Sequence, residues 1–206
     1  AVLSTQLKKR NAMNKTLPSF SRLMPLTGAV SAAVLLSACG SMLPSSSGSK
    51  AMFSQDSLPD AIKVPAGNKV AMETVGMGEI TYECRDKANA AGQTEWVFVG
   101  PKAALNDRSG KQVGTYYGPP ATWESTDGSK ITATQLAAAP AGAGNIPYQL
   151  VKANPAMGSG AMTGVTFIQR VALKGGAAPA AACTMSNKGE RQIVKYQADY
   201  IFWKAA

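Results

Sequence analysis

The chain has 206 residues, 45% of them hydrophobic, which is enough for one domain with a core but not comfortably enough for two. It carries a formal net charge of +9 and contains no histidine. The absence of histidine excludes the usual Ser-His-Asp and Cys-His nucleophile systems and removes the commonest transition-metal ligand. We therefore expect neither a bound metal nor a cofactor.

The positive charge is concentrated near the N-terminus. Residues 1–38 hold five basic residues and no acidic one, which leaves 16 basic against 12 acidic residues in 39–206. The Lys and Arg residues of this larger part are scattered singly, without the clustered stripe that phosphate neutralisation requires. We therefore expect no nucleic-acid partner and assign the basic excess to targeting.

Residues 1–38 have the organisation of a signal peptide. From Met13, a basic region is followed by the apolar stretch Leu23–Leu36 and then by small residues. The apolar stretch has 14 residues, whereas a helix that spans a bilayer needs about 20. We therefore expect a signal peptide instead of a permanent transmembrane helix, with residues 1–12 upstream of the true start.

The apolar stretch ends in Leu36-Ser37-Ala38-Cys39. This segment resembles the bacterial lipobox, where a signal peptidase cuts before a cysteine that receives a lipid. The resemblance implies that Cys39 inserts acyl chains into the membrane, each buried CH₂ contributing about 0.8 kcal/mol. Gly40 stands where an Asp would retain many enterobacterial lipoproteins at the inner membrane, so the resemblance favours the outer membrane, on its periplasmic or surface face. The alternative is ordinary signal cleavage after Gly40, which would leave an unanchored exported protein.

The segment Gly40–Ser57 is rich in serine and poor in apolar residues, a composition typical of a flexible tether. The sequence thus divides into a signal peptide at 1–38, a lipidated cysteine and tether at 39–57, and a single β domain at 58–206.

The first predicted strands of this domain are short. Residues 80–84 alternate apolar and polar side chains, and Trp96 and Phe98 belong to a second strand that ends before the Gly100-Pro101 break. Both patterns are typical of half-buried strands.

Three further elements follow. Thr122–Ser125 and Lys130–Thr134 flank Asp127-Gly128, the strongest hairpin signal in the chain, because both turn residues tolerate a positive φ. Val165–Leu173 is a long run of β-favouring residues. In the last predicted strand, one parity is apolar and is expected to face the core: Val194, Tyr196, Ala198, Tyr200 and Phe202.

Residues 137–144 and 175–182 are rich in Ala, Gly and Pro and are predicted to be loops. Strands at these spacings, without alternating helices, predict a mainly β single domain with long Ala/Gly/Pro-rich loops. Its architecture is expected to be an antiparallel β-sandwich or a barrel-like fold, with the sandwich preferred.

Cys84 and Cys183 remain once Cys39 carries the lipid. An exported protein meets an oxidising compartment, so we expect these two cysteines to form a disulfide. The alternative is a pair of buried free thiols. A catalytic thiol is disfavoured because no histidine is available to generate a thiolate.

An ordered set of short motifs runs through residues 58–204. It comprises Gly78-Glu79-Ile80-Thr81-Tyr82-Glu83-Cys84, Trp96 with Pro101, Gly118-Pro119-Pro120-Ala121-Thr122-Trp123-Glu124, Asp127-Gly128-Ser129, Ile168-Gln169-Arg170-Val171, Gly175-Gly176, Pro179, Cys183 and Tyr196-Gln197-Ala198-Asp199-Tyr200. This set resembles the family called domain of unknown function 3455, exported bacterial and fungal proteins without an established activity. The resemblance supports the domain and adds no chemistry. The family has a histidine before its Gly-Pro motif, where this chain has Tyr116 and Tyr117, so any shared catalytic role of that histidine would be missing here.

The first functional hypothesis is a non-enzymatic envelope module that binds a glycan, a small ligand or a protein partner. Its candidate residues surround the Gly-Pro-Pro turn or lie on a later strand: Tyr116, Tyr117, Trp123, Glu124 and Arg170. The alternative interpretation places Trp123 in the core, uses the tyrosines to cap the sheet, and pairs Arg170 with a carboxylate of Glu124, Asp127 or Asp199.

The second hypothesis is a carboxylate-based hydrolase acting on an envelope or extracellular glycan, with Glu124, Asp127 and Asp199 as candidates. The turn explains Asp127 and the polar face of a strand explains Asp199, so neither requires catalysis. The third hypothesis is a purely structural surface lipoprotein. Binding predicts exposed Trp123 and Tyr117 in a shallow groove, whereas catalysis predicts two carboxylates about 5 to 10 Å apart in a cleft.

Overall fold

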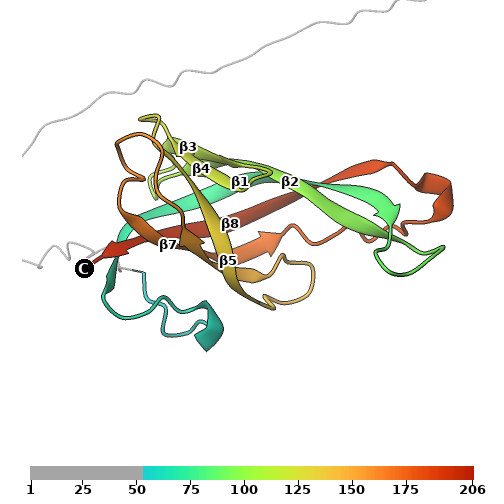
Figure 1. Cartoon of the computed structure of the whole chain (residues 1–206), viewed down its shortest axis with the longest axis horizontal. Helices are drawn as coiled ribbons and strands as arrows, with labels where there is room; N and C mark the ends of the chain where they lie inside the picture. Colours follow the sequence, from blue (N-terminus) through green and yellow to red (C-terminus); the bar gives the residue numbers. More distant parts are fainter. Residues whose placement is uncertain (1–52) are drawn as a thin grey trace, which may run out of the picture. The chain divides into compact units, whose positions relative to one another are not determined.

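The computed structural model describes residues 53–206, which form eight β-strands and two short 3₁₀ helices (Figure 1). The elements are η1 (Asp60–Ile62), β1 (Asn68–Asp86), β2 (Thr94–Asn106), β3 (Gln112–Tyr117), β4 (Thr122–Ser125), β5 (Lys130–Ala139), β6 (Tyr148–Ala153), β7 (Val165–Gly175), η2 (Met185–Asn187) and β8 (Arg191–Ala205). The proposed signal peptide, Cys39 and residues 40–52 lie outside the described residues. No helix in this part of the chain is long and apolar enough to cross a membrane.

The eight strands form one antiparallel sheet that closes on itself. Each strand pairs with the next in sequence, and β1 also pairs with β8, so the order around the barrel is β1 to β8. The predicted mainly β, antiparallel single domain is confirmed. The sheet does not split into the two layers of a sandwich, because pairing of β1 with β8 satisfies the two strand edges that would otherwise stay open.

The arm is formed by β1, β2 and β8, which are longer than the barrel wall and continue beyond it at the right of Figure 1. Pairing of β2 with β3 begins only at Lys102, and pairing of β8 with β7 stops at Tyr196. The prediction that a strand ends before Gly100-Pro101 is wrong, since β2 runs through both residues. A register shift after Thr81 accommodates them, consistent with the tolerance of strands for proline at bulges.

A disulfide fastens the connection between β7 and β8 to this arm. Cys84 of β1 and Cys183 are joined with a Cα–Cα distance of 5.5 Å, which confirms the predicted pairing. Two hydrogen bonds to the same connection come from β2: Trp96 Nε1 donates to the Ala181 carbonyl at 2.6 Å, and Thr94 Oγ1 donates to the Cys183 carbonyl at 2.9 Å. The connection therefore lies against the arm although it contains little regular structure.

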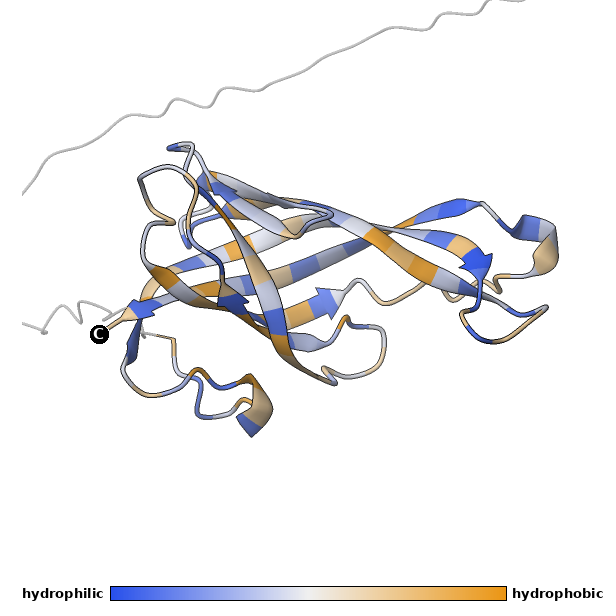
Figure 2. Cartoon of the chain, viewed as in Figure 1, coloured by the Kyte–Doolittle hydropathy of each residue, from blue (hydrophilic) through white to orange (hydrophobic). Residues whose placement is uncertain are grey.

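The inner core follows the predicted parity of the last strand. Tyr196, Ala198, Tyr200 and Phe202 are buried inside the barrel, with Val194 half-buried at the same parity. They pack against inward-facing residues of the other strands, among them Ile80, Leu105, Ile131, Val151 and Ile168. Figure 2 shows the resulting alternation of hydrophobic and hydrophilic residues along the strands.

A second apolar cluster covers the outside of β6, β7 and β8. Ile201 and Trp203, at the opposite parity of β8, are buried because residues 53–64 lie across them; we call this segment the strap. Phe53 meets the Trp203 ring edge-on at 6.3 Å, and Ile62 is fully buried. The serine-rich composition assigned residues 53–57 to the tether, but in the structure they belong to the strap. The reason is that the apolar Phe53 side chain packs against Trp203.

The two Ala- and Gly-rich segments are loops only in part. Residues 137–139 extend β5 and pair with β6, so the loop predicted at 137–144 begins later. Gly175 ends β7, and residues 176–182 contain no strand. Alanine is permitted at half-buried strand positions when a neighbouring strand supplies the pairing, which composition alone does not reveal.

Candidate functional site

The strands separate the five predicted binding residues into two groups. Tyr116 pairs with Trp123 and both point into the barrel, whereas Tyr117 and Glu124 point outward. Successive side chains of a strand lie on opposite faces, so the Tyr-Tyr and Trp-Glu neighbours cannot share one surface. Arg170 of β7 shares its parity with Ile168 and faces inward.

On the outer face, Tyr117 is held by Glu124. The Tyr117 side chain is 38% exposed, and its hydroxyl donates to Glu124 Oε2 at 2.7 Å. Lys130 Nζ lies 3.5 Å from the other oxygen of the same carboxylate. The Tyr117 hydrogen bond and then Lys130 lower the pKa of Glu124, while the bond to the ionised carboxylate raises the pKa of Tyr117. The carboxylate thus stays charged and fixes the ring in place.

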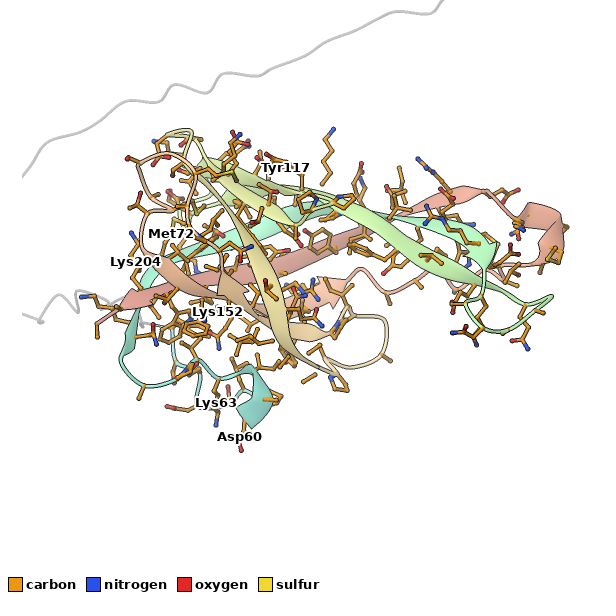
Figure 3. All side chains as sticks on the ribbon, viewed as in Figure 1. Asp60, Lys63, Met72, Tyr117, Lys152 and Lys204 are labelled. Atoms are coloured by element: carbon orange, nitrogen blue, oxygen red, sulfur yellow. A yellow bond between two sulfur atoms is a disulfide. The ribbon has the colours of Figure 1, made fainter. Side chains whose placement is uncertain are left out.

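Beside Tyr117, a shallow groove of about 740 Å³ runs over the outside of β1, β2 and β3. Its lining includes Glu79, Lys102, Ala104, Gln112, Thr115 and Tyr117. Lys102 stands opposite Tyr117 on one side and Glu79 on the other, and Ala104 stands opposite Thr115. Figure 3 shows Tyr117 on the outer side of the sheet, far from the strap that carries Asp60 and Lys63.

The groove combines one aromatic ring with several hydrogen-bonding side chains around a small residue. Glu79 is tied to Lys195 at 2.8 Å, and this hydrogen bond lowers its pKa. Lys102 makes no ion pair with any residue of 53–206. Ala104 contributes only a methyl group to this lining. Such a surface offers a ring for stacking and polar groups at its rim.

Inside the barrel, Trp123 and Tyr116 belong to the core. They are 1% and 4% exposed, their rings stack with centroids 4.7 Å apart, and Tyr200 packs against both. Trp123 therefore does not line an exposed groove. The alternative interpretation, in which Trp123 is a core residue, is correct. Its Nε1–H has no acceptor among the described residues.

Arg170 pairs with none of the three expected carboxylates. Its Nε and Nη2 both donate to the Pro147 carbonyl, at 3.2 and 2.9 Å. Asp199 instead accepts from Arg108 at 2.6 Å, on the outside of the barrel. The expectation fails because Arg170 points inward, whereas Glu124 and Asp199 belong to outward-facing positions.

Comparison with known proteins places this architecture in a family. The family described as "Protein of unknown function (DUF3455)" matches residues 65–204. The chain belongs to the DUF3455 family. The match covers more than half of the chain and extends over the whole barrel to within one residue of the end of β8. Neither the curated proteins nor the solved structures include a match to the chain.

The carboxylates of this DUF3455 domain are engaged separately. Asp127 accepts hydrogen bonds from the Ser129 hydroxyl at 2.6 Å and from the Ala161 backbone N–H at 2.7 Å, and these bonds lower its pKa to about 2. The pKa of Glu124 is also lowered, whereas a general acid requires a raised one. Within residues 53–206, no cluster of Cys, Asp and Glu side chains is arranged to hold a metal ion.

Sequence reasoning missed the polar side of the DUF3455 groove. Lys102 lies on β2, Gln112 and Thr115 lie on β3, and none of the three belongs to a recognisable motif. The register of β2 with β3 brings Lys102 and Thr115 next to Tyr117 and Ala104. A regular strand extended through Pro101 would have placed Lys102 and Ala104 on the same face as Trp96 and Phe98. The register shift after Thr81 turns them to the outer face instead, and the local sequence pattern does not reveal this shift.

Proposed function

We propose that this DUF3455 chain is an exported lipoprotein, anchored in the cell envelope through Cys39, whose barrel is a non-enzymatic module that binds a glycan. The observation that carries the binding role is the groove beside Tyr117. The anchor is supported by the lipobox-like segment before Cys39 and by the absence of acidic residues from the basic signal-like region.

The groove suits a sugar ring because it offers an apolar face beside hydrogen-bonding groups. The Tyr117 ring is exposed and is held by Glu124, so little conformational entropy is lost when a ligand stacks on it. Lys102, Gln112 and Thr115 lie at hydrogen-bonding positions along the same lining. A flat open groove with an ordered ring accepts one face of a saccharide and leaves the other in solvent.

A carboxylate hydrolase has no comparable support. Glu124 is occupied by Tyr117 and Lys130, Asp127 by its turn, and Asp199 by Arg108. A glycosidase needs one carboxyl group whose raised pKa lets it donate a proton. We therefore assign Glu124 the role of holding the ring.

The binding role is tested with the purified full chain and soluble N-acetylglucosamine oligomers and peptidoglycan fragments as probes, by calorimetry. Tyr117→Ala should weaken binding by about tenfold or more, since a stacked aromatic anchor is worth more than about 1.4 kcal/mol. Tyr117→Phe keeps the ring but loses the Glu124 hydrogen bond, so a loss of about fivefold is expected.

The matched control is Ile193→Ala, which removes an exposed apolar side chain from the outside of the arm (59% exposed). It should leave the affinity unchanged. Equal affinities of the wild-type chain and Tyr117→Ala, or no saturable binding to any of these glycans, would reject the proposed ligand.

The anchor is tested separately by fractionating cells that express the wild-type chain or Cys39→Ala. The wild-type chain should sediment with the outer membrane, and intact mass should show a lipidated N-terminus at Cys39. The variant should be released from the membrane. A wild-type chain that begins after Gly40 without lipid would reject the anchor and leave the binding role untouched.

A further inference from the structure

We call the end of the barrel interior bounded by the loop between β5 and β6 the barrel mouth and define it by Arg170, Gln149, Tyr82, Phe98 and the Pro147 carbonyl. Arg170 stands between Gln149 of β6 and Tyr200 of β8 in the sheet register. Its side chain is half-buried and inward-facing, in a barrel whose other inward positions are mostly apolar.

The charge of Arg170 has no counter-ion in the protein. All 12 acidic residues of the chain lie within residues 53–206, and none of them forms an ion pair with Arg170. The other three arginines in this part of the chain are all paired: Arg85 and Arg191 with Glu83, and Arg108 with Glu73 and Asp199. Of these arginines, the inward-facing one alone is left without a carboxylate.

The groups around Arg170 are neutral. The Tyr196 and Tyr200 hydroxyls bond each other at 3.1 Å, and the Tyr82 hydroxyl donates to the Gly176 carbonyl at 2.8 Å. Burial raises the pKa of each of these phenols, an effect that the Arg170 charge only partly opposes, so they do not supply an anion. The two Arg170 hydrogen bonds to Pro147 use part of the guanidinium, whose planar fork matches a carboxylate.

Apolar surface adjoins this charge. Phe98 is 49% exposed and meets the Tyr82 ring edge-on at 6.0 Å. Tyr82 belongs to the inner core, so this contact places an exposed ring beside the barrel interior. Two residues after Arg170, Ala172 has a φ of +50° at a register shift of β7 against β8. Bulges and left-handed non-glycine residues re-aim side chains, and they gather near functional positions.

We propose that Arg170 binds the carboxylate of a small organic anion at the barrel mouth and that Tyr82 and Phe98 hold its apolar body. An unpaired, partly desolvated guanidinium is unfavourable for folding on its own. In the proposed complex, the carboxylate of the ligand supplies the negative charge that Arg170 lacks in the protein alone. This site is separate from the outer groove, so its ligand and that of the proposed glycan site bind independently.

The test uses the full chain in a non-ionic detergent and three probes with a carboxylate and an apolar body: benzoate, phenylacetate and octanoate. Binding is measured by calorimetry against the corresponding neutral amides. At least one acid should bind saturably, and its amide should bind about tenfold or more weakly. Failure of all three acids to bind, or equal binding of acid and amide, overturns the proposal.

Three variants assign the binding to Arg170. Arg170→Met should abolish acid binding, Arg170→Lys should retain a weakened form of it, and Arg191→Gln, which changes the net charge by the same amount at an exposed site, should bind as the wild type does. Equal loss in Arg191→Gln would mean non-specific charge attraction and would overturn the site. Glycan binding should be unchanged in Arg170→Met, which separates this site from the outer groove.

The unfolding temperature distinguishes a ligand-binding arginine from a structural one. Without ligand, Arg170→Met should unfold at the same temperature as the wild type or higher, because replacing an uncompensated charge with an apolar group relieves its desolvation cost. A structural role in holding Pro147 would instead lower the unfolding temperature by about 5 °C or more. That decrease would overturn the proposal, and a variant that failed to fold would do the same.

Discussion

Trp203 donates its indole Nε1–H to the side-chain oxygen of Gln169 at 2.8 Å, on the outside of the barrel. The amide nitrogen of the same Gln169 donates to the Ile62 carbonyl at 2.7 Å and to Gln55 at 3.1 Å. One buried glutamine therefore joins β7, β8 and the strap. This bond network explains how an outward-facing polar residue comes to be fully buried.

The substitution Gln169→Leu should lower the free energy of unfolding by about 2 to 4 kcal/mol. The substitution leaves the Trp203 N–H and the Ile62 carbonyl buried without partners, and each unsatisfied group costs about 1 to 3 kcal/mol. The measurement is the free energy of unfolding in guanidinium chloride. The control Gln197→Leu, on the outer face of β8 with no side-chain hydrogen bond to residues 53–206, should change it by less than about 0.5 kcal/mol. Equal effects of the two substitutions would contradict this role of Gln169.

Removal of the disulfide in the double variant Cys84→Ala/Cys183→Ala should destabilise the fold by about 3 to 5 kcal/mol. The bond closes a separation of 99 residues, and the chain-entropy treatment gives about 4.7 kcal/mol for a loop of roughly this length. Chemical unfolding of the oxidised wild type, the reduced wild type and the variant measures the difference. The reduced wild type and the variant should agree, and an unfolding midpoint that does not move on reduction would contradict the prediction.

Asp127 should make the stability depend on pH in the acid range. Its hydrogen bonds hold the pKa near 2 in the folded protein, below the value of about 3.9 for an unfolded chain. A depressed pKa contributes stability above the unfolded value, and this contribution is lost as the pH falls from about 4 towards 2. Asp127→Asn should therefore flatten the dependence of unfolding temperature on pH in this window.

The control for that experiment is Asp56→Asn, because the Asp56 carboxylate accepts no side-chain hydrogen bond within the described residues. It should retain the wild-type pH dependence. Glu83, whose pKa is also held near 2 by hydrogen bonds from Arg85 and Arg191, should preserve part of the slope in Asp127→Asn. An unchanged slope in Asp127→Asn would contradict the assigned shift.

The sequence by itself determined the features that depend on local pattern. Period-2 alternation identified the buried parity of Tyr196 to Phe202, because a strand must send successive side chains to opposite faces. The Asp127-Gly128 turn fixed the β4–β5 hairpin, with Gly128 at a φ of +85°. The even pair of cysteines left after Cys39, with an oxidising compartment expected, predicted the disulfide between Cys84 and Cys183.

Only the tertiary structure decided which surfaces were covered and which charges met. Trp203 has the parity of an exposed residue, and a strap about 140 residues earlier in the sequence buries it. Trp123 and Tyr117 are near neighbours in the hairpin of β3 and β4, yet barrel closure places one in the core and the other in solvent. Arg170 pairs with none of the expected carboxylates because the register turns it inward, whereas Glu124 and Asp199 face outward. Parity gives two faces for each strand, but the pairing of distant strands decides what lies against each face.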